Sequence, residues 1–145
     1  MTNDTRAIFL DIDGTLIPFG AEAPCEQDRT ALLRARAAGH KVLINTGRSS
    51  GFLPPVLRTA DYLDGFLCGC GTQLIIGGKT LFKQEIPREA LRQVLAYFLA
   101  SPGEGCFFEG ETALLTIQRT HPQGQMLTRA DDFDTRFAGE SVTKL

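Results

Sequence analysis

Short apolar runs alternate with longer amphipathic stretches through the first half of the chain. Runs at residues 8–12, 42–44 and 63–68 have the length and composition of buried strands. Between the first two, residues 24–38 carry apolar positions at helical spacing after a proline, and a short helix is expected over 52–59. The order strand, helix, strand predicts a βαβ unit, whose parallel strands end at one edge of a sheet.

The pattern changes after Gly71, which divides the chain into an α/β domain of residues 1–71 and an α+β domain of residues 72–145. The second domain is expected to contain a hairpin over 73–76 and 79–86 with a Gly77-Gly78 turn, an amphipathic helix over 87–100, a hairpin over 106–109 and 113–118, a weak helix near 129–133 and a short strand over 142–145.

Composition narrows the classes of function. The chain has 145 residues, 43% of them hydrophobic and 22% charged, and a net charge of −2. This charge gives no electrostatic reason to expect nucleic acid or an anionic membrane as a partner. No apolar stretch is long enough to span a bilayer, and the residues before Asp11 do not resemble a signal peptide. The expected location is the cytoplasm.

The four cysteines do not form a common metal or redox motif. Cys68 and Cys70 are separated by one residue, whereas common zinc and redox motifs have two between them. Cys25 and Cys106 lie far from this pair, and a chain of this size with four cysteines is not a disulfide scaffold. Reduced, buried thiols are therefore expected.

Two carboxylates lie at the C-terminal end of the first predicted strand. Side chains alternate faces along a strand, so Asp11 and Asp13 are expected to begin on the same side, and Gly14 permits a sharp turn after them. Mg²⁺ binds one or two carboxylates together with phosphate oxygens and water, and it would relieve the repulsion between the two acids. A solvated turn needs no apolar strand before it, and a calcium loop has a different spacing. The pair therefore indicates metal-assisted phosphate chemistry.

Polar residues also follow the second predicted strand. Thr46, Gly47 and Arg48 supply a hydroxyl, backbone N–H groups and a guanidinium, all of which can bind phosphate oxygens. The alternative interpretation is an ordinary strand-to-helix turn with a capping hydroxyl. Because ligands of open α/β sheets bind where the strands end, this segment and the acidic pair are expected to share one site.

The segment FLDIDGTL resembles the first motif of the haloacid dehalogenase superfamily, and Thr46-Gly47-Arg48 is typical of its Cof-type branch. The resemblance implies a Rossmann-like α/β core with an inserted α+β cap. It also implies that Asp11 is the nucleophile and a Mg²⁺ ligand, and that Asp13 is the general acid/base and binds Mg²⁺ through its backbone carbonyl. Thr46 and Gly47 would hold the phosphoryl group, and Arg48 would contact substrate.

The sequence departs from this family in several places. Asn45 stands where a small residue is usual, and Cys70-Gly71-Thr72 replaces an Asn-Gly-Ala motif. The lysine and second acidic pair that the family carries after its cap have no clear counterpart, because Lys144 and Asp131-Asp132 lie in cap-like sequence. The chain thus resembles the first half of a typical member, an incomplete core with three parallel strands. Its first strand would have an unpaired edge, at which self-association is expected.

The function implied by the resemblance is Mg²⁺-dependent hydrolysis of a phosphomonoester through an aspartyl-phosphate. The substrate would be a small phosphorylated metabolite such as a sugar phosphate. One alternative is a sugar phosphomutase of the same branch. The other is a catalytically inactive fragment that binds phosphate or Mg²⁺, or an interaction module, which the missing lysine and second acidic pair favour.

Overall fold

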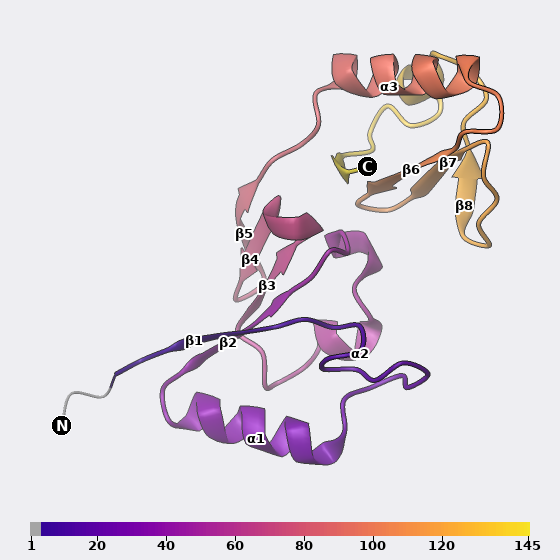
Figure 1. The fold of residues 1–145 in the computed structure, drawn as a ribbon. Coiled ribbons are helices and arrows are strands. Elements are labelled where there is room, and N and C mark those ends of the chain that lie inside the picture. Colours follow the sequence, from indigo (N-terminus) through magenta and orange to yellow (C-terminus); the bar gives the residue numbers. More distant parts are fainter. Residues whose placement is uncertain (1–3) are drawn as a thin grey trace. The chain divides into compact units, whose positions relative to one another are not determined.

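The computed structural model describes residues 4–145, which form two compact units that divide between Lys83 and Gln84 (Figure 1). Each unit has its own sheet and its own apolar core. No helix among the described residues is long and apolar enough to cross a membrane.

The first unit is built on a five-stranded sheet in the order β1-β2-β3-β4-β5. Its strands are β1 (Ala7–Leu10), β2 (Lys41–Asn45), β3 (Gly65–Cys68), β4 (Gln73–Ile76) and β5 (Lys79–Lys83), and its helices are α1 (Glu26–Ala37) and α2 (Pro55–Arg58), with 3₁₀ turns η1 (Ser50–Phe52) and η2 (Gly69–Gly71). The first three strands are parallel and the last two antiparallel. The predicted α/β class with three parallel strands is confirmed.

Local chemistry explains where α1 begins. The Cys25 sulfur accepts a hydrogen bond from the Asp28 N–H, at 3.4 Å, and so caps the helix. The helix therefore begins at Glu26, two residues after the proline at which the sequence pattern predicts its start. Acids lie in the first turn of the helix and arginines in its last turn, which suits the helix dipole. Half-buried Leu32 and Leu33 pack against a core that includes Ile12 and Ile44.

The β4–β5 hairpin belongs to the first sheet. Its turn has positive φ at Gly77 (+55°) and Gly78 (+76°), as the sequence pattern predicts. However, β4 pairs with β3, and a Cβ at Gly65 would collide with the Ile75 carbonyl of β4. The contacts therefore divide the chain after this hairpin, and not at Gly71 where the sequence pattern changes. The choice of partner strand depends on tertiary pairing, which the hairpin pattern does not encode.

The second unit packs one long helix with a four-stranded sheet of order β8-β7-β6-β9. Its elements are α3 (Arg88–Ala100), β6 (Cys106–Gly110), β7 (Leu114–Ile117), β8 (Gly124–Met126), α4 (Asp132–Thr135) and β9 (Val142–Lys144). Leu91 and Leu95 of α3 are buried in a core with Phe108 and Phe133, whose rings meet edge to face at 5.2 Å. β8 was not expected from the sequence.

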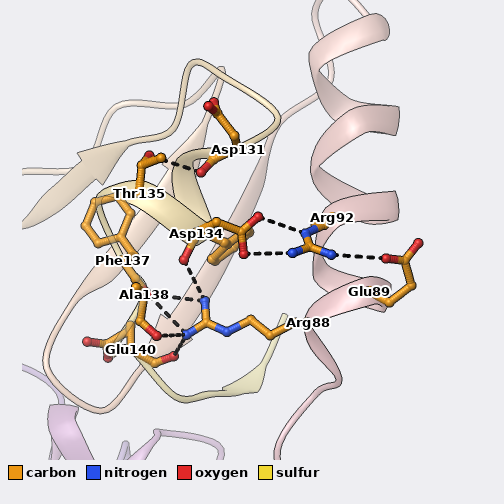
Figure 2. Close-up of polar contacts among 10 residues, drawn as sticks. Arg88, Glu89, Arg92, Asp131, Asp134, Thr135, Phe137, Ala138 and Glu140 are labelled. Atoms are coloured by element: carbon orange, nitrogen blue, oxygen red, sulfur yellow. Dashed lines mark hydrogen bonds and ion pairs between the residues drawn. The ribbon is translucent and has the colours of Figure 1, made fainter.

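Two arginines on α3 hold the segment that contains α4 (Figure 2). Arg88 donates to four backbone carbonyls, those of Phe133, Phe137, Ala138 and Glu140. Arg92 forms a two-pronged ion pair with Asp134, with both N···O distances 2.9 Å, and a weaker one with Glu89. Both arginines therefore have a structural role in the second unit.

The cysteines are all free thiols. Cys68 is buried, and burial raises the pKa of its thiol to about 11. The expectation of buried thiols is wrong for Cys25 and Cys70, which are exposed, and Cys106 is partly buried. Cys25 is exposed because it caps a surface helix, and Cys70 because it lies in the 3₁₀ turn that follows β3.

Candidate functional site

The two polar segments predicted to share a site follow adjacent parallel strands. Leu10 of β1 is opposite Ile44 of β2, so Asp11 and Asn45 continue the two strands at the same edge. Ile12 is completely buried, whereas Asp11 and Asp13 on either side of it are exposed. This alternation is what the spacing of the acids predicts.

An ion pair joins the two segments directly. Arg48 donates from Nε and Nη2 to the two carboxylate oxygens of Asp13, at 3.0 and 2.6 Å. The Nη1 group of the same guanidinium donates to the Phe52 carbonyl, at 3.2 Å. The hydrogen bonds from Arg48 lower the pKa of Asp13, and they outweigh the smaller opposing effect of burial. Asp13 is therefore held as a carboxylate.

Thr46 is fixed between the ends of β2 and β3. Its side chain is buried, and its hydroxyl oxygen accepts from the Arg48 N–H at 3.2 Å. The Thr46 N–H donates to the Leu67 carbonyl, and the Thr46 carbonyl accepts from the Cys70 N–H, at 3.1 Å. The Gly69 N–H donates to the Arg48 carbonyl, at 2.8 Å. The turn after β3 thus supports the candidate phosphate-binding loop through its backbone, a contribution that no side-chain motif reveals.

The chain turns sharply after the acidic pair and forms one wall of a pocket. Gly14 has φ +77°, and a Cβ there would lie 2.6 Å from a ring carbon of Phe19. The pocket, of about 500 Å³, is lined by Asp13 and Arg48 and by residues of the 17–22 loop and of 54–56. Sequence reasoning did not single out Phe19, although a large apolar residue in a Pro/Gly-containing loop was a usable signal.

The acids offer a partial ligand set for Mg²⁺. Among the described residues, none forms a hydrogen bond or ion pair with the Asp11 carboxylate, so its oxygens are available to a cation. No group of three or more His, Cys, Asp or Glu residues suited to a metal ion occurs among residues 4–145. Mg²⁺ commonly binds one or two carboxylates and completes its shell with phosphate oxygens and water. The residues present fit that kind of site.

The acidic and basic residues near the C-terminus have structural partners in the second unit. Lys144 forms an ion pair with Glu109 at 3.1 Å. Asp132 is buried, and its Oδ2 accepts from the backbone N–H groups of Thr128 and Arg129, at 2.6 and 2.9 Å. Burial alone would raise the pKa of Asp132, but these bonds and Arg136 lower it. Because Lys144 and Asp132 have structural partners in the second unit, we leave both out of the candidate site.

Comparison with known proteins gives matches over most of the chain. A family model described as haloacid dehalogenase-like hydrolase matches residues 8–142. YkrA of Bacillus subtilis (strain 168), provisionally named a phosphatase, is 29% identical over 92 residues, which are 63% of this chain and 35% of YkrA.

Solved structures match the chain as well. One comes from a crystallographic study of a trigonal-bipyramidal intermediate that is conserved in a phosphoryl-transfer superfamily. It is 30% identical to this chain with a TM-score of 0.67, and the match covers 80% of this chain and 45% of that one. The subclass IIB sugar phosphatase BT4131 is 25% identical with a TM-score of 0.64, over 97% of this chain and 52% of that one. The chain thus spans about a third of YkrA and about half of these structures.

Proposed function

Because the chain belongs to the haloacid dehalogenase-like hydrolases, in their Cof-type branch, we propose that it hydrolyses phosphomonoesters with Mg²⁺ through an aspartyl-phosphate. The substrate class we propose is a small phosphorylated metabolite such as a sugar phosphate. One observation carries this proposal. Asp11 and Asp13 lie at the end of β1, beside the Thr46–Arg48 loop at the end of β2, and an ion pair between Arg48 and Asp13 joins the two segments. The second unit is proposed as the family's α+β cap.

Asp11 is the proposed nucleophile, because its carboxylate is exposed and unpaired among the described residues. One of its oxygens attacks phosphorus, the P–O bond to the organic group breaks, and Asp13 gives a proton to the departing oxygen. Water then attacks phosphorus of the aspartyl-phosphate and loses a proton to Asp13. Inorganic phosphate leaves, and the Asp11 carboxylate is restored.

The Thr46–Arg48 loop is proposed to hold the phosphoryl oxygens. The hydroxyl of Thr46 accepts from the Arg48 N–H and can still donate its own hydrogen, and the Gly47 N–H is a second donor. Arg48 must leave Asp13 before that carboxyl can carry a proton, and the doubly charged phosphoryl group is a competing partner for its guanidinium. Substrate binding would thereby release the general acid.

Mg²⁺ would be held by the Asp11 carboxylate and the Asp13 backbone carbonyl, and when bound it would offset the negative charge of the phosphoryl group. Without such a cation, the acids would repel an anionic substrate. Asp11 therefore serves two roles, as the attacking group and as a ligand.

The test is release of inorganic phosphate by the 145-residue chain from p-nitrophenyl phosphate and glucose 6-phosphate, with and without Mg²⁺. We expect Mg²⁺-dependent release, loss of at least about a hundredfold in Asp11→Asn, and no effect of Asp61→Asn, a control at an exposed acid of the same unit. Absence of release from folded protein would contradict the proposal and leave phosphate binding as the function. An isomeric sugar phosphate in place of inorganic phosphate would indicate a mutase.

A further inference from the structure

The pocket beside Asp13 contains an exposed aromatic ring that the proposed chemistry does not use. Phe19 is 86% exposed, although phenylalanine is usually buried. Carbons along one edge of the ring pack against Gly14, where any side chain would collide with them. The ring is therefore seated on the backbone next to the acidic pair.

The loop that carries Phe19 is held by its own backbone. The Gly14 N–H donates to the Ile17 carbonyl and the Ile17 N–H to the Ile12 carbonyl, both at 2.9 Å. The Ala21 N–H donates to the Pro18 carbonyl, also at 2.9 Å. The backbone of the loop is thus ordered before any ligand binds, which lowers the entropy cost of binding.

The position of Asp13 identifies what the pocket receives. A general acid must lie within hydrogen-bond distance of the oxygen that it protonates, so the ester oxygen of the substrate lies beside Asp13. The organic group attached to that oxygen begins at the same place. Asp13 and Arg48 line this pocket, which offers the organic group about 500 Å³.

The other lining residues determine which organic group fits. They are mainly apolar, including Phe19, Pro54 and Val56, and they include Glu22, whose carboxylate accepts hydrogen bonds. A group with one apolar face and several hydroxyls satisfies both kinds of surface. Resting on the proposed function, we propose that this pocket is the leaving-group subsite, and that a sugar ring lies with its C–H face on Phe19 and its hydroxyls toward Glu22.

The experiment measures dissociation constants by titration calorimetry in an Asp11→Asn background, which prevents turnover, with Mg²⁺ present. The ligands are inorganic phosphate, glycerol 3-phosphate and glucose 6-phosphate. Phe19→Ala is expected to weaken glucose 6-phosphate about tenfold, with less than a twofold effect on the other two ligands. Phe19→Tyr keeps the ring and should bind like the parent. Phe82→Ala, at a half-exposed phenylalanine of β5 that does not line the pocket, is the matched control.

Unchanged glucose 6-phosphate binding in Phe19→Ala would overturn the subsite, and so would an equal loss for all three ligands. The first result would leave phosphate binding intact, and the second would show that Phe19 supports the binding of phosphate itself. Failure of the parent to bind any of the three ligands would instead overturn the proposed function, and the subsite with it.

Discussion

Arg48 donates hydrogen bonds to both carboxylate oxygens of Asp13, at 3.0 and 2.6 Å, and so connects the turn after β1 with the loop after β2. The pairing stabilises the ionised form of the residue that is proposed to act as an acid. The structure thus shows the site in a state from which the proposed proton transfer cannot start until Arg48 moves.

Replacing Arg48 should therefore change how Asp13 titrates. Arg48 lowers the pKa of Asp13 below its ordinary value of 3.8, so Arg48→Met should raise it, toward or above that value. Carbon-detected NMR of the aspartate carboxyl groups measures the midpoint directly. Arg29→Met removes another exposed ion-pair partner of the first unit and should leave Asp13 unchanged. Identical Asp13 midpoints in the parent and Arg48→Met would show that the ion pair is absent in solution.

The same substitution should have little effect on stability. The side chains of Arg48 and Asp13 are 40% and 48% exposed, and ion pairs with that exposure contribute at most about 1 kcal/mol. Urea unfolding of the parent and Arg48→Met would measure the difference. A loss of several kcal/mol would mean that Arg48 holds the loop mainly through its other contacts.

Asp64 should make the first unit sensitive to acid. Its carboxylate, 12% exposed, accepts from the Val42 N–H at 2.9 Å and from Arg36 at 3.1 Å. Burial alone would raise the pKa of Asp64, but these bonds and Lys41 lower it overall. A lowered folded-state pKa stabilises the fold above the ordinary value of 3.8, and the stabilisation is lost as pH falls through the folded-state pKa.

Asp64→Asn should consequently destabilise the first unit by about 1–3 kcal/mol at pH 7, with a smaller difference from the parent below pH 3.8. Amide hydrogen exchange in β2 and β3 reports the stability of this unit separately from the other. Asp61→Asn, at a more exposed acid, is the matched control. A difference between Asp64→Asn and the parent that does not depend on pH would contradict the assigned cause.

Arg88 and Arg92 allow a matched comparison in the second unit (Figure 2). Arg88→Met leaves four carbonyls without their donor and should destabilise this unit by about 2–3 kcal/mol. Arg92→Met removes exposed ion pairs on the same helix and should have a much smaller effect. Hydrogen exchange in α3 and β6 distinguishes them. An equal loss of stability in Arg88→Met and Arg92→Met would show that the carbonyl contacts of Arg88 stabilise the unit no more than an exposed ion pair does.

The edge of the first sheet gives a prediction about self-association. Within residues 4–145, β1 pairs with β2 alone, and its Phe9 is 53% exposed. The opposite edge strand, β5, has a lysine at each end, a feature that discourages edge pairing. We predict concentration-dependent association of the 145-residue chain that Phe9→Lys reduces and Leu81→Lys on β5 does not. Sedimentation velocity measures it, and a monomer at all concentrations would contradict it.

Much of the fold and of the site could be predicted from local pattern. The apolar runs of β1 and β2, the helical spacing of α1 and the Gly77-Gly78 turn each reflect interactions within a few residues. The α/β class and the family are confirmed, because the FLDIDGTL and Thr46-Gly47-Arg48 segments record a specific arrangement of functional groups. The roles of Asp11, Asp13 and Thr46 remain predictions.

Only the tertiary structure decided which distant residues meet. The sequence marks the hairpin of β4 and β5, but its place in the first sheet depends on the close approach of β4 to Gly65. The sequence does not reveal that Arg48 and Asp13 form an ion pair, or that the Phe19 ring packs against Gly14. Strand patterns and acid spacing follow from local geometry, whereas these contacts follow from how separate segments pack, which local periodicity does not specify.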